Sequence, residues 1–301
     1  MEQILADTAL EKAKKWAKMA WADDISSWSE RHEQDYAYRQ YVVEPPLSNL
    51  ISQLDLKSSS LMIEIGCGDG VHSIFLRQQL NKSGLDNINI LGIDFLEPLI
   101  VKARKNAEGY KNISFEMADA TDINTVKMIH NKIGIPDVII AMFLLHYVPD
   151  LEGTLKMVKS CLKEKGHFIA VFVYPDFAAH LFEAGYIKRL KEGYLPDEYI
   201  TDSGIVQWRF VGYYPIAQKS GPPFYLPYFH RSLADYYKAF ESFNLEITDK
   251  IPLMLEPHIA NKLREEKVSP FYEDKWNIYW PYIVREPSSI LIHALRDKGN
   301  E

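Results

Sequence analysis

The sequence predicts an α/β protein with a doubly wound, mostly parallel sheet. Between positions 61 and 174, short apolar runs alternate with segments of helical periodicity. The first apolar run ends in a turn with little side-chain bulk, Gly66-Cys67-Gly68-Asp69-Gly70, and a helical segment follows it. Strands that alternate with helices form parallel sheets with right-handed crossovers.

Each element follows from its local pattern. Helices are expected over 2–53, with a separate one opened by Pro45-Pro46 and continuing to Leu54. Later helices are expected over 71–80, from 97, over 151–163, and over 233–240 after the cap residue Ser232. The predicted strands are 61–65, 88–94, 113–117, 137–142, 167–174, 245–253 and 289–295.

The alternation predicts where the domains divide. It stops at Pro175 and resumes near 231, and the stretch between is rich in aromatic residues. We therefore expect an N-terminal helical cap, a core in two parts, an inserted substrate lid and a second small insertion. Their ranges are 1–58 for the cap, 59–175 and 231–301 for the core, 176–230 for the lid, and 256–286 for the second insertion.

Composition excludes several classes of function. The 301 residues carry a net charge of −7, which argues against a nucleic-acid partner because such a partner requires a basic surface. Two cysteines give neither a disulfide framework nor metal-ligand spacing, so no metal is expected. No apolar stretch fits a signal peptide or a membrane span, which predicts a cytoplasmic protein without a membrane partner. Aromatic residues in 256–286 fit either a lid or a homodimer contact.

The glycine-rich turn discriminates between nucleoside cofactors. A dinucleotide fingerprint requires glycine where Val71 stands, and no Gly-Lys-Ser/Thr follows for a P-loop. An NAD(P)-dependent oxidoreductase is therefore the disfavoured alternative. Glu64 lies inside the strand and requires a hydrogen-bonding reason for its burial. Cys67 is interpreted as a small residue near the ligand and not as a nucleophile.

Further candidates follow the other strands. Ligands of open parallel sheets bind beyond the carboxyl ends of the strands. Asp94 ends the second strand, where its carboxylate can accept hydrogen bonds from both hydroxyls of a ribose. Asp119-Ala120 follows the third strand, and Met142-Phe143 follows the fourth.

These motifs together resemble the class I S-adenosylmethionine-dependent methyltransferases, in their small-molecule, UbiE-like or type 11 branch. IEIGCGDG is similar to the first motif, LGIDFLEPLI to the second, MADATDI to the third and DVIIAMFLLHYVPD to the fourth. The likeness covers about 60–295 and leaves the aromatic insertion unassigned.

The resemblance implies a seven-stranded, Rossmann-like sheet whose last strand is antiparallel. It implies S-adenosylmethionine as cofactor and S-adenosylhomocysteine as product. It also places Asp94 on the ribose, Phe95 beside the adenine, Asp119 near the adenine amino group, and the Ala120 backbone next to them.

The methionine part of this cofactor needs its own partners. The backbone around Gly66 and Gly68 can approach it, and Arg39 with Tyr36 or Tyr38 could close over it from the N-terminal segment. A surface ion pair is the alternative for Arg39. Phe143 is a candidate for cation–π attraction to the sulfonium.

The predicted reaction is methyl transfer to O or N of a small, aromatic or largely apolar molecule. An in-line displacement depends on alignment of the acceptor and exclusion of water. His146 is the first candidate base and His230 the second, while Tyr174 could face the acceptor. Structural roles are the alternative for both histidines. A carboxyl methyltransferase and a non-catalytic cofactor-binding protein are alternative functions.

Aromatic residues of the insertion are the expected substrate contacts. They would enclose an apolar or planar acceptor, and their hydroxyl groups could orient it. The alternative is that they form the core of a small subdomain. The residues are Trp208, Tyr213, Tyr214, Tyr225 and Tyr228.

Overall fold

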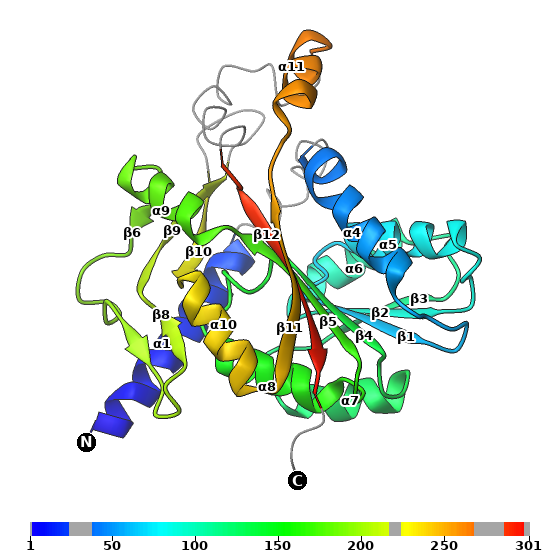
Figure 1. The fold of residues 1–301 in the computed structure, drawn as a ribbon. Helices are drawn as coiled ribbons and strands as arrows, with labels where there is room; N and C mark the ends of the chain where they lie inside the picture. The colour runs from blue at the N-terminus through cyan, green and yellow to red at the C-terminus, as the bar shows by residue number, and fades with distance from the viewer. Residues whose placement is uncertain (1, 24–37, 217–223, 268–285, 298–301) are drawn as a thin grey trace.

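A seven-stranded sheet forms the centre of the molecule (Figure 1). The computed structural model describes residues 2–23, 38–216, 224–267 and 286–297. Across the sheet the strands are β11 (Leu245–Leu253), β12 (Ser289–Arg296), β5 (His167–Val173), β4 (Val138–Met142), β1 (Leu61–Ile65), β2 (Asn89–Asp94) and β3 (Ile113–Met117).

The strand order creates a switch point beside β1. The chain proceeds from β1 to β2 and β3 on one side, and then returns to place β4 on the other side of β1. These strands and β5 pair in parallel, whereas β12 is antiparallel to both β5 and β11. The prediction of a mostly parallel sheet with an antiparallel last strand is confirmed.

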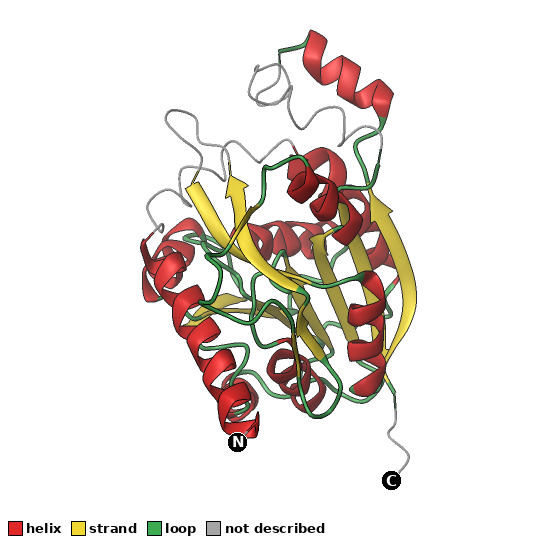
Figure 2. Ribbon diagram, turned by 90° about the vertical axis from the view of Figure 1, so that its left-hand side faces the viewer, coloured by secondary structure: helices red, strands yellow, loops and turns green. Residues whose placement is uncertain are grey.

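Helices cover both faces of this sheet (Figure 2). Alternate residues of one strand face different layers: Met62 packs with α4 and α5, while Ile63 packs with α7, α8 and α10. A sheet buried on both faces explains the nearly continuous apolar strands. The helices are α4 (Glu44–Gln53), α5 (Val71–Lys82), α6 (Glu97–Asn106), α7 (Asn124–Lys132), α8 (Leu151–Cys161) and α10 (Leu233–Ser242).

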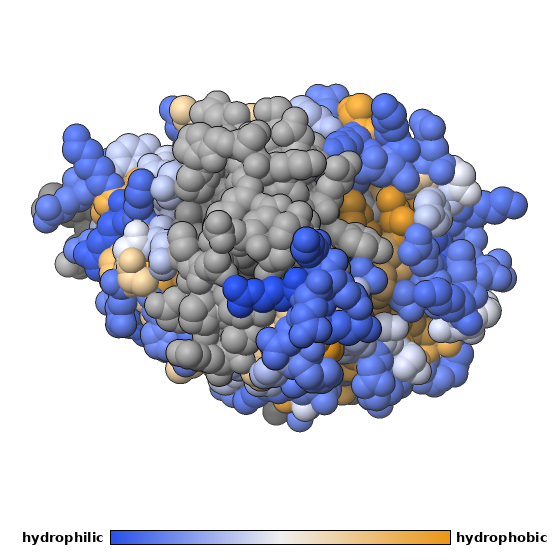
Figure 3. Space-filling model, turned by 90° about the horizontal axis from the view of Figure 1, so that it is seen from above, coloured by the Kyte–Doolittle hydropathy of each residue, from blue (hydrophilic) through white to orange (hydrophobic). Residues whose placement is uncertain are grey.

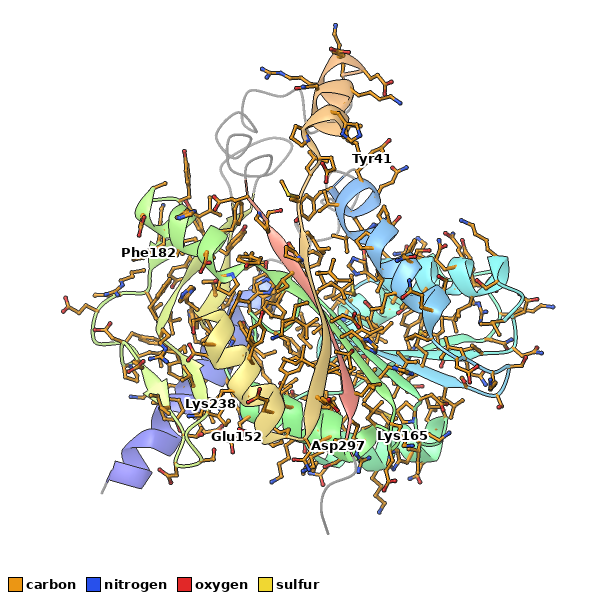
Figure 4. The ribbon with its side chains drawn as sticks, viewed as in Figure 1. Tyr41, Glu152, Lys165, Phe182, Lys238 and Asp297 are labelled. Carbon is orange, nitrogen blue, oxygen red and sulfur yellow. The ribbon has the colours of Figure 1, made fainter. Side chains whose placement is uncertain are left out.

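The segment between β5 and α10 forms two small sheets of its own. One has the order β10-β9-β6 and the other pairs β7 with β8. The turn before β8 is held to the core because Glu152 of α8 accepts from Ser203 and Lys238 of α10 donates to the Gly204 carbonyl (Figure 4). The elements are α9 (Pro175–Glu183), β6 (Lys188–Arg189), β7 (Tyr199–Ile200), β8 (Val206–Trp208), β9 (Phe210–Ile216) and β10 (Phe224–His230).

Three helices were not predicted: α7, α9 and the helix over 257–265. Pro175 was interpreted as the end of regular structure, but it occupies the first turn of α9, where its missing N–H costs nothing. Helix α7 is amphipathic, but its N-cap residue, Ile123, makes no side-chain capping bond, so the usual start signal is missing.

The N-terminal segment contains α1 (Glu2–Asp23) and a π-helical turn, η1 (Arg39–Val43), which leads into α4. Tyr36 lies outside the described residues, so its predicted role stays a prediction. Helix α11 (Pro257–Glu265) begins the second predicted insertion, of which residues 268–285 are not described. None of the described helices is long and apolar enough to cross a membrane.

Hydrophilic residues cover much of the described surface seen from above, with apolar residues showing between them (Figure 3).

The Phe115 ring of β3 packs against the turn that follows β1, residues 66–70. A Cβ atom added at Gly92 would lie 2.5 Å from its Cδ1, and one at Gly70 would lie 2.8 Å from its Cζ. The phenyl ring thus fills the space left by two glycines, and it packs in one cluster with Cys67 and Ala103. This packing fixes the position of the turn after β1.

We predict that Gly92→Ala lowers the free energy of unfolding by about 1–3 kcal/mol, because the new methyl group overpacks the ring of Phe115. Urea denaturation would measure the loss. A second replacement, Phe115→Leu, should recover part of it. Equal stability of Gly92→Ala and the parent would contradict this packing.

Candidate functional site

Three glycines give the turn after β1 its shape. Gly66, Gly68 and Gly70 have φ values of +68°, +54° and +81°, a region that side chains disfavour. A Cβ atom at Gly66 would also lie 2.7 Å from Leu144 Cδ1. The turn therefore exposes bare backbone at the start of α5, where a ligand can approach N–H groups.

Asp94 joins this turn to the next one. One carboxylate oxygen accepts from Gly68 N at 3.0 Å, and the other accepts from Leu96 N at 3.0 Å. Burial raises the pKa of Asp94 to about 6, although these backbone hydrogen bonds act in the opposite direction. The residue is 8% exposed, so its carboxylate is nearly enclosed at the end of β2.

A hydrogen bond compensates for the burial of the Glu64 carboxylate, as its position inside a strand requires. Its carboxylate is fully buried and accepts a hydrogen bond from the Ser73 hydroxyl of α5. The second oxygen, Oε1, has no hydrogen-bond partner among the described residues and lies 3.5 Å from His72 Nδ1. A buried oxygen with unused acceptor capacity fits a ligand amino group.

Cys67 is 3% exposed in the same turn. Burial raises the pKa of its thiol well above the ordinary value, and the nearby Asp94 and Glu64 carboxylates act in the same direction. A thiol that stays protonated is a poor nucleophile. The interpretation that Cys67 is not a nucleophile therefore fits its burial, while its place beside a ligand stays a prediction.

Asp119 lies beyond β3 with both oxygens occupied. Oδ1 accepts from Thr121 N and Oγ1 at 2.9 and 2.7 Å, while Oδ2 lies 2.7 Å from Lys18 Nζ of α1. Burial would raise the pKa of Asp119, but these partners outweigh it and hold the pKa below the ordinary value. Lys18 Nζ also lies 5.9 Å from the Phe95 ring centre, and Ala120 is buried alongside.

The loop after β4 brings a strained residue to the site. Met142 is buried, and Phe143 has a φ of +53°, which is uncommon for a bulky side chain. Its backbone N–H donates to Val171 of β5 at 2.7 Å, so the strand pairing holds the conformation. The phenyl ring lies 6.3 Å from the ring of His72 and 6.4 Å from that of His146.

His146 is more enclosed than the sequence suggests. It is 1% exposed, and neither ring nitrogen has a hydrogen-bond partner among the described residues. The Tyr147 and Tyr228 rings lie 3.9 and 6.1 Å from it. Burial, and then the charge of Arg231, lower the pKa of His146 to about 3, so this histidine does not titrate near neutral pH as an exposed one would.

Arg231 ties this loop to the insertion. Its buried guanidinium donates to the carbonyls of Leu145 and Val148 at 2.8 and 2.7 Å. The Phe229 N–H of β10 donates to the His146 carbonyl at 2.9 Å. Arg231, just after the insertion, and Phe229 within it therefore fix the backbone around His146.

The other two catalytic candidates lie near the same loop. His230 Nδ1 is 3.1 Å from Tyr228 Oη, and its ring stacks on Phe210 at 4.5 Å. Burial, and then Arg231, lower the pKa of His230 to about 4. Tyr174 directly follows β5 as the N-cap residue of α9, its N–H donates to the Ser288 carbonyl, and its ring packs against both core clusters.

The five predicted substrate aromatics do not converge. Successive residues of a strand point to opposite faces, so β9 sends Tyr213 and Tyr214 to different sides. Tyr214 packs against Tyr228 at 5.8 Å on the face toward His146. Tyr213 instead contacts Trp16 of α1 and lies 6.5 Å from Tyr225.

Trp208 is a core residue. It is fully buried among Leu195, Val211 and Phe229, and its Nε1 donates to the Pro196 carbonyl at 3.0 Å. For Trp208 the alternative of a subdomain core therefore describes the structure better than a substrate contact.

Of the N-terminal candidates, Arg39 and Tyr38 lie among the described residues. Arg39 Nε lies 3.0 Å from Glu44 Oε1 within the same helical segment. The preceding Tyr38 hydroxyl shares hydrogen bonds with the hydroxyls of Ser288 and Ser289 at the start of β12.

Sequence reasoning missed Lys14, Lys18 and Arg231. The two lysines are four residues apart and share one face of α1, beside the face of Ala13 and Ala17 that packs into the insertion. That spacing could have indicated a second functional face. Nothing local in the sequence predicts that Arg231 is buried. The described residues contain no cluster of side chains that could hold a metal ion.

Comparison with known proteins places this site in context. A family model described as "Methyltransferase domain" matches residues 56–193. The ubiquinone biosynthesis O-methyltransferase of Coxiella burnetii is 25% identical over 174 residues, which cover 56% of this chain and 69% of that protein.

Two solved structures share the fold at low sequence identity. The putative methyltransferase complexed with the Trm112 activator of Haloferax volcanii gives a TM-score of 0.56 at 13% identity, over 93% of this chain and 98% of that chain. A geranyl diphosphate methyltransferase in complex with SAM gives 0.52 at 11% identity, over 84% and 85%.

We predict that His146 contributes to acid sensitivity. Because its pKa is lowered on folding, its stabilising contribution is full above about 6.5 and is lost as the pH falls towards 3. In that range the unfolded chain binds one more proton than the folded chain, so the free energy of unfolding falls by about 1.4 kcal/mol for each pH unit. Urea unfolding at several pH values would measure this dependence. In His146→Leu the free energy of unfolding should depend on pH less steeply, by about this amount. An unchanged slope would contradict the burial of a neutral imidazole.

Proposed function

Because the chain belongs to the class I S-adenosylmethionine-dependent methyltransferases, we propose that it methylates O or N of a small, aromatic or largely apolar molecule. The observation that carries this proposal is His146, a buried imidazole with two unpartnered nitrogens among the rings of Phe143, Tyr147 and Tyr228. An apolar enclosure with one polar group suits an acceptor that has one O–H or N–H group.

The turns after β1 and β2 fit the cofactor. The glycines from 66 to 70 leave the backbone bare, and Glu64 has an unused buried oxygen for an amino group. Asp94 would accept from the ribose hydroxyls, while Phe95 and Asp119 would hold the adenine. When bound, S-adenosylmethionine supplies an activated methyl group on its sulfonium sulfur.

The residues of the β4 loop would act on the acceptor. Its backbone is fixed by β5 and by Arg231, so His146 can hold an O–H or N–H group in one orientation. Near neutral pH the imidazole is neutral, and one of its ring nitrogens can therefore accept a hydrogen bond from the acceptor. His230 with Tyr228 is the second candidate pair, and Tyr174 could contact the acceptor from β5.

The name of the Coxiella relative favours oxygen as the accepting atom. A carboxylate acceptor is the alternative, and its ester product would be cleaved by mild base. The cytoplasmic location, a homodimer, the lid at 176–230 and the absence of a nucleic-acid partner stay predictions of the sequence.

The cofactor assignment predicts the behaviour of Asp94→Asn. Loss of a charged acceptor should weaken binding of S-adenosylhomocysteine by about tenfold or more, as measured by calorimetric titration. In the parent protein, affinity should also fall as the pH drops through about 6, where Asp94 takes up a proton. Asp86→Asn, at an exposed position beyond α5, is the matched control. Full affinity of Asp94→Asn would remove the ribose assignment.

The acceptor assignment predicts a separation of binding from turnover. A screen of phenols, amines and carboxylic acids with methyl-labelled S-adenosylmethionine should identify an acceptor. With that acceptor, His146→Leu should reduce turnover by about 10²-fold or more while S-adenosylhomocysteine affinity changes little. If His230→Leu loses turnover and His146→Leu keeps it, the base is His230. Bound cofactor without turnover on any acceptor class would favour a non-catalytic protein.

A further inference from the structure

Helix α1 contacts the rest of the protein through two different faces. Ala13, Trp16 and Ala17 pack into the insertion, where the Trp16 ring lies 5.7 Å from that of Phe229 (Figure 1). Lys14 and Lys18 lie four residues apart on another face and reach carboxylates that follow strands of the main sheet. The helix thus connects the insertion to the carboxyl edge of the sheet.

Lys14 is an anchor. Its Nζ lies 2.8 Å from Asp150 Oδ2, and the other oxygen of Asp150 caps α8 through Gly153 N. Burial would lower the pKa of Lys14, but Asp150 outweighs it and keeps the pKa above the ordinary value. This pair and the aromatic packing hold α1 in place independently of Lys18.

Lys18 reaches the residues assigned to the adenine. Its Nζ lies 2.7 Å from Asp119 Oδ2 and 5.9 Å from the Phe95 ring centre. The other oxygen of Asp119 already accepts twice from Thr121. Oδ2 is therefore the oxygen at which an adenine amino group would donate, and the ammonium group already binds it.

We propose that Lys18 is a latch that competes with the adenine amino group for Asp119. The inference rests on the proposed adenine assignment of Asp119. When the cofactor binds, its adenine amino group replaces the Lys18 ammonium group as the donor to Asp119. The Lys18 side chain then moves into solvent, while Lys14 keeps α1 in place. Lys18 thereby lowers the affinity for adenine nucleosides and keeps Asp119 charged and oriented when the adenine is absent.

The latch is weak enough to open. The side chain of Lys18 is 53% exposed and that of Asp119 is 26% exposed, so solvent screens the pair. Such pairs change an equilibrium constant by no more than about fivefold. Ligands of micromolar affinity can therefore displace the ammonium group.

The test is calorimetric titration of S-adenosylhomocysteine into the full chain and two variants. Lys18→Met removes the competing donor and should tighten binding by about two- to fivefold. Lys15→Met, which removes the same charge from an exposed position of α1, should leave affinity unchanged. Circular dichroism would verify that both variants keep the helical content of the parent.

A second ligand makes the test specific to the amino group. S-inosylhomocysteine has a carbonyl oxygen in its place, so it does not compete for Asp119 and should gain no affinity in Lys18→Met. Unchanged or weaker binding of S-adenosylhomocysteine to Lys18→Met would overturn the latch. If S-adenosylhomocysteine bound neither the parent protein nor Lys18→Met nor Lys15→Met, the cofactor assignment itself would be overturned.

Discussion

The Asp94 carboxylate is the constraint on which the site depends. It receives one backbone N–H from the turn after β1 and one from the turn after β2, and it does so while nearly buried. Removing a carboxylate from water is unfavourable unless hydrogen bonds replace its hydration. The two turns supply those hydrogen bonds. Because one carboxylate binds both turns, it also fixes the distance between them. Phe115 completes the arrangement by filling the space above Gly70 and Gly92.

The second half of the site depends on the insertion. Arg231 and the N–H of Phe229 hold the loop that contains His146, so elements distant in sequence fix one histidine backbone. Side chains alternate between the two faces of the β9–β10 sheet. Tyr214 and Tyr228 therefore lie on the face toward this loop, and Tyr213 and Tyr225 lie on the opposite face. The same insertion packs on α1, which reaches Asp119 through Lys18. Acceptor and cofactor regions are therefore parts of one packed structure.

Local patterns predicted the sheet because each strand is buried on both faces and bounded by turn residues. The glycine turn and Asp94 were also evident, since their roles depend on position within one strand–turn–helix unit. Long-range packing decided the rest. The low pKa of His146 reflects burial under β10, and the enclosure of Trp208 reflects packing against α1. Neither neighbour is close in sequence. The two faces of α1 do have a local signal, because Lys14 and Lys18 are spaced four residues apart and so lie on one side of the helix.

A crystal structure of the complex with S-adenosylhomocysteine tests the central claim most directly. The account predicts ribose hydroxyls within hydrogen-bonding distance of Asp94 and an adenine ring between Phe95 and Asp119. It also predicts that the sulfur faces the loop of Phe143 and His146. A ligand bound elsewhere, or one whose ribose makes no contact with Asp94, would contradict the assignment of this edge of the sheet as the cofactor site.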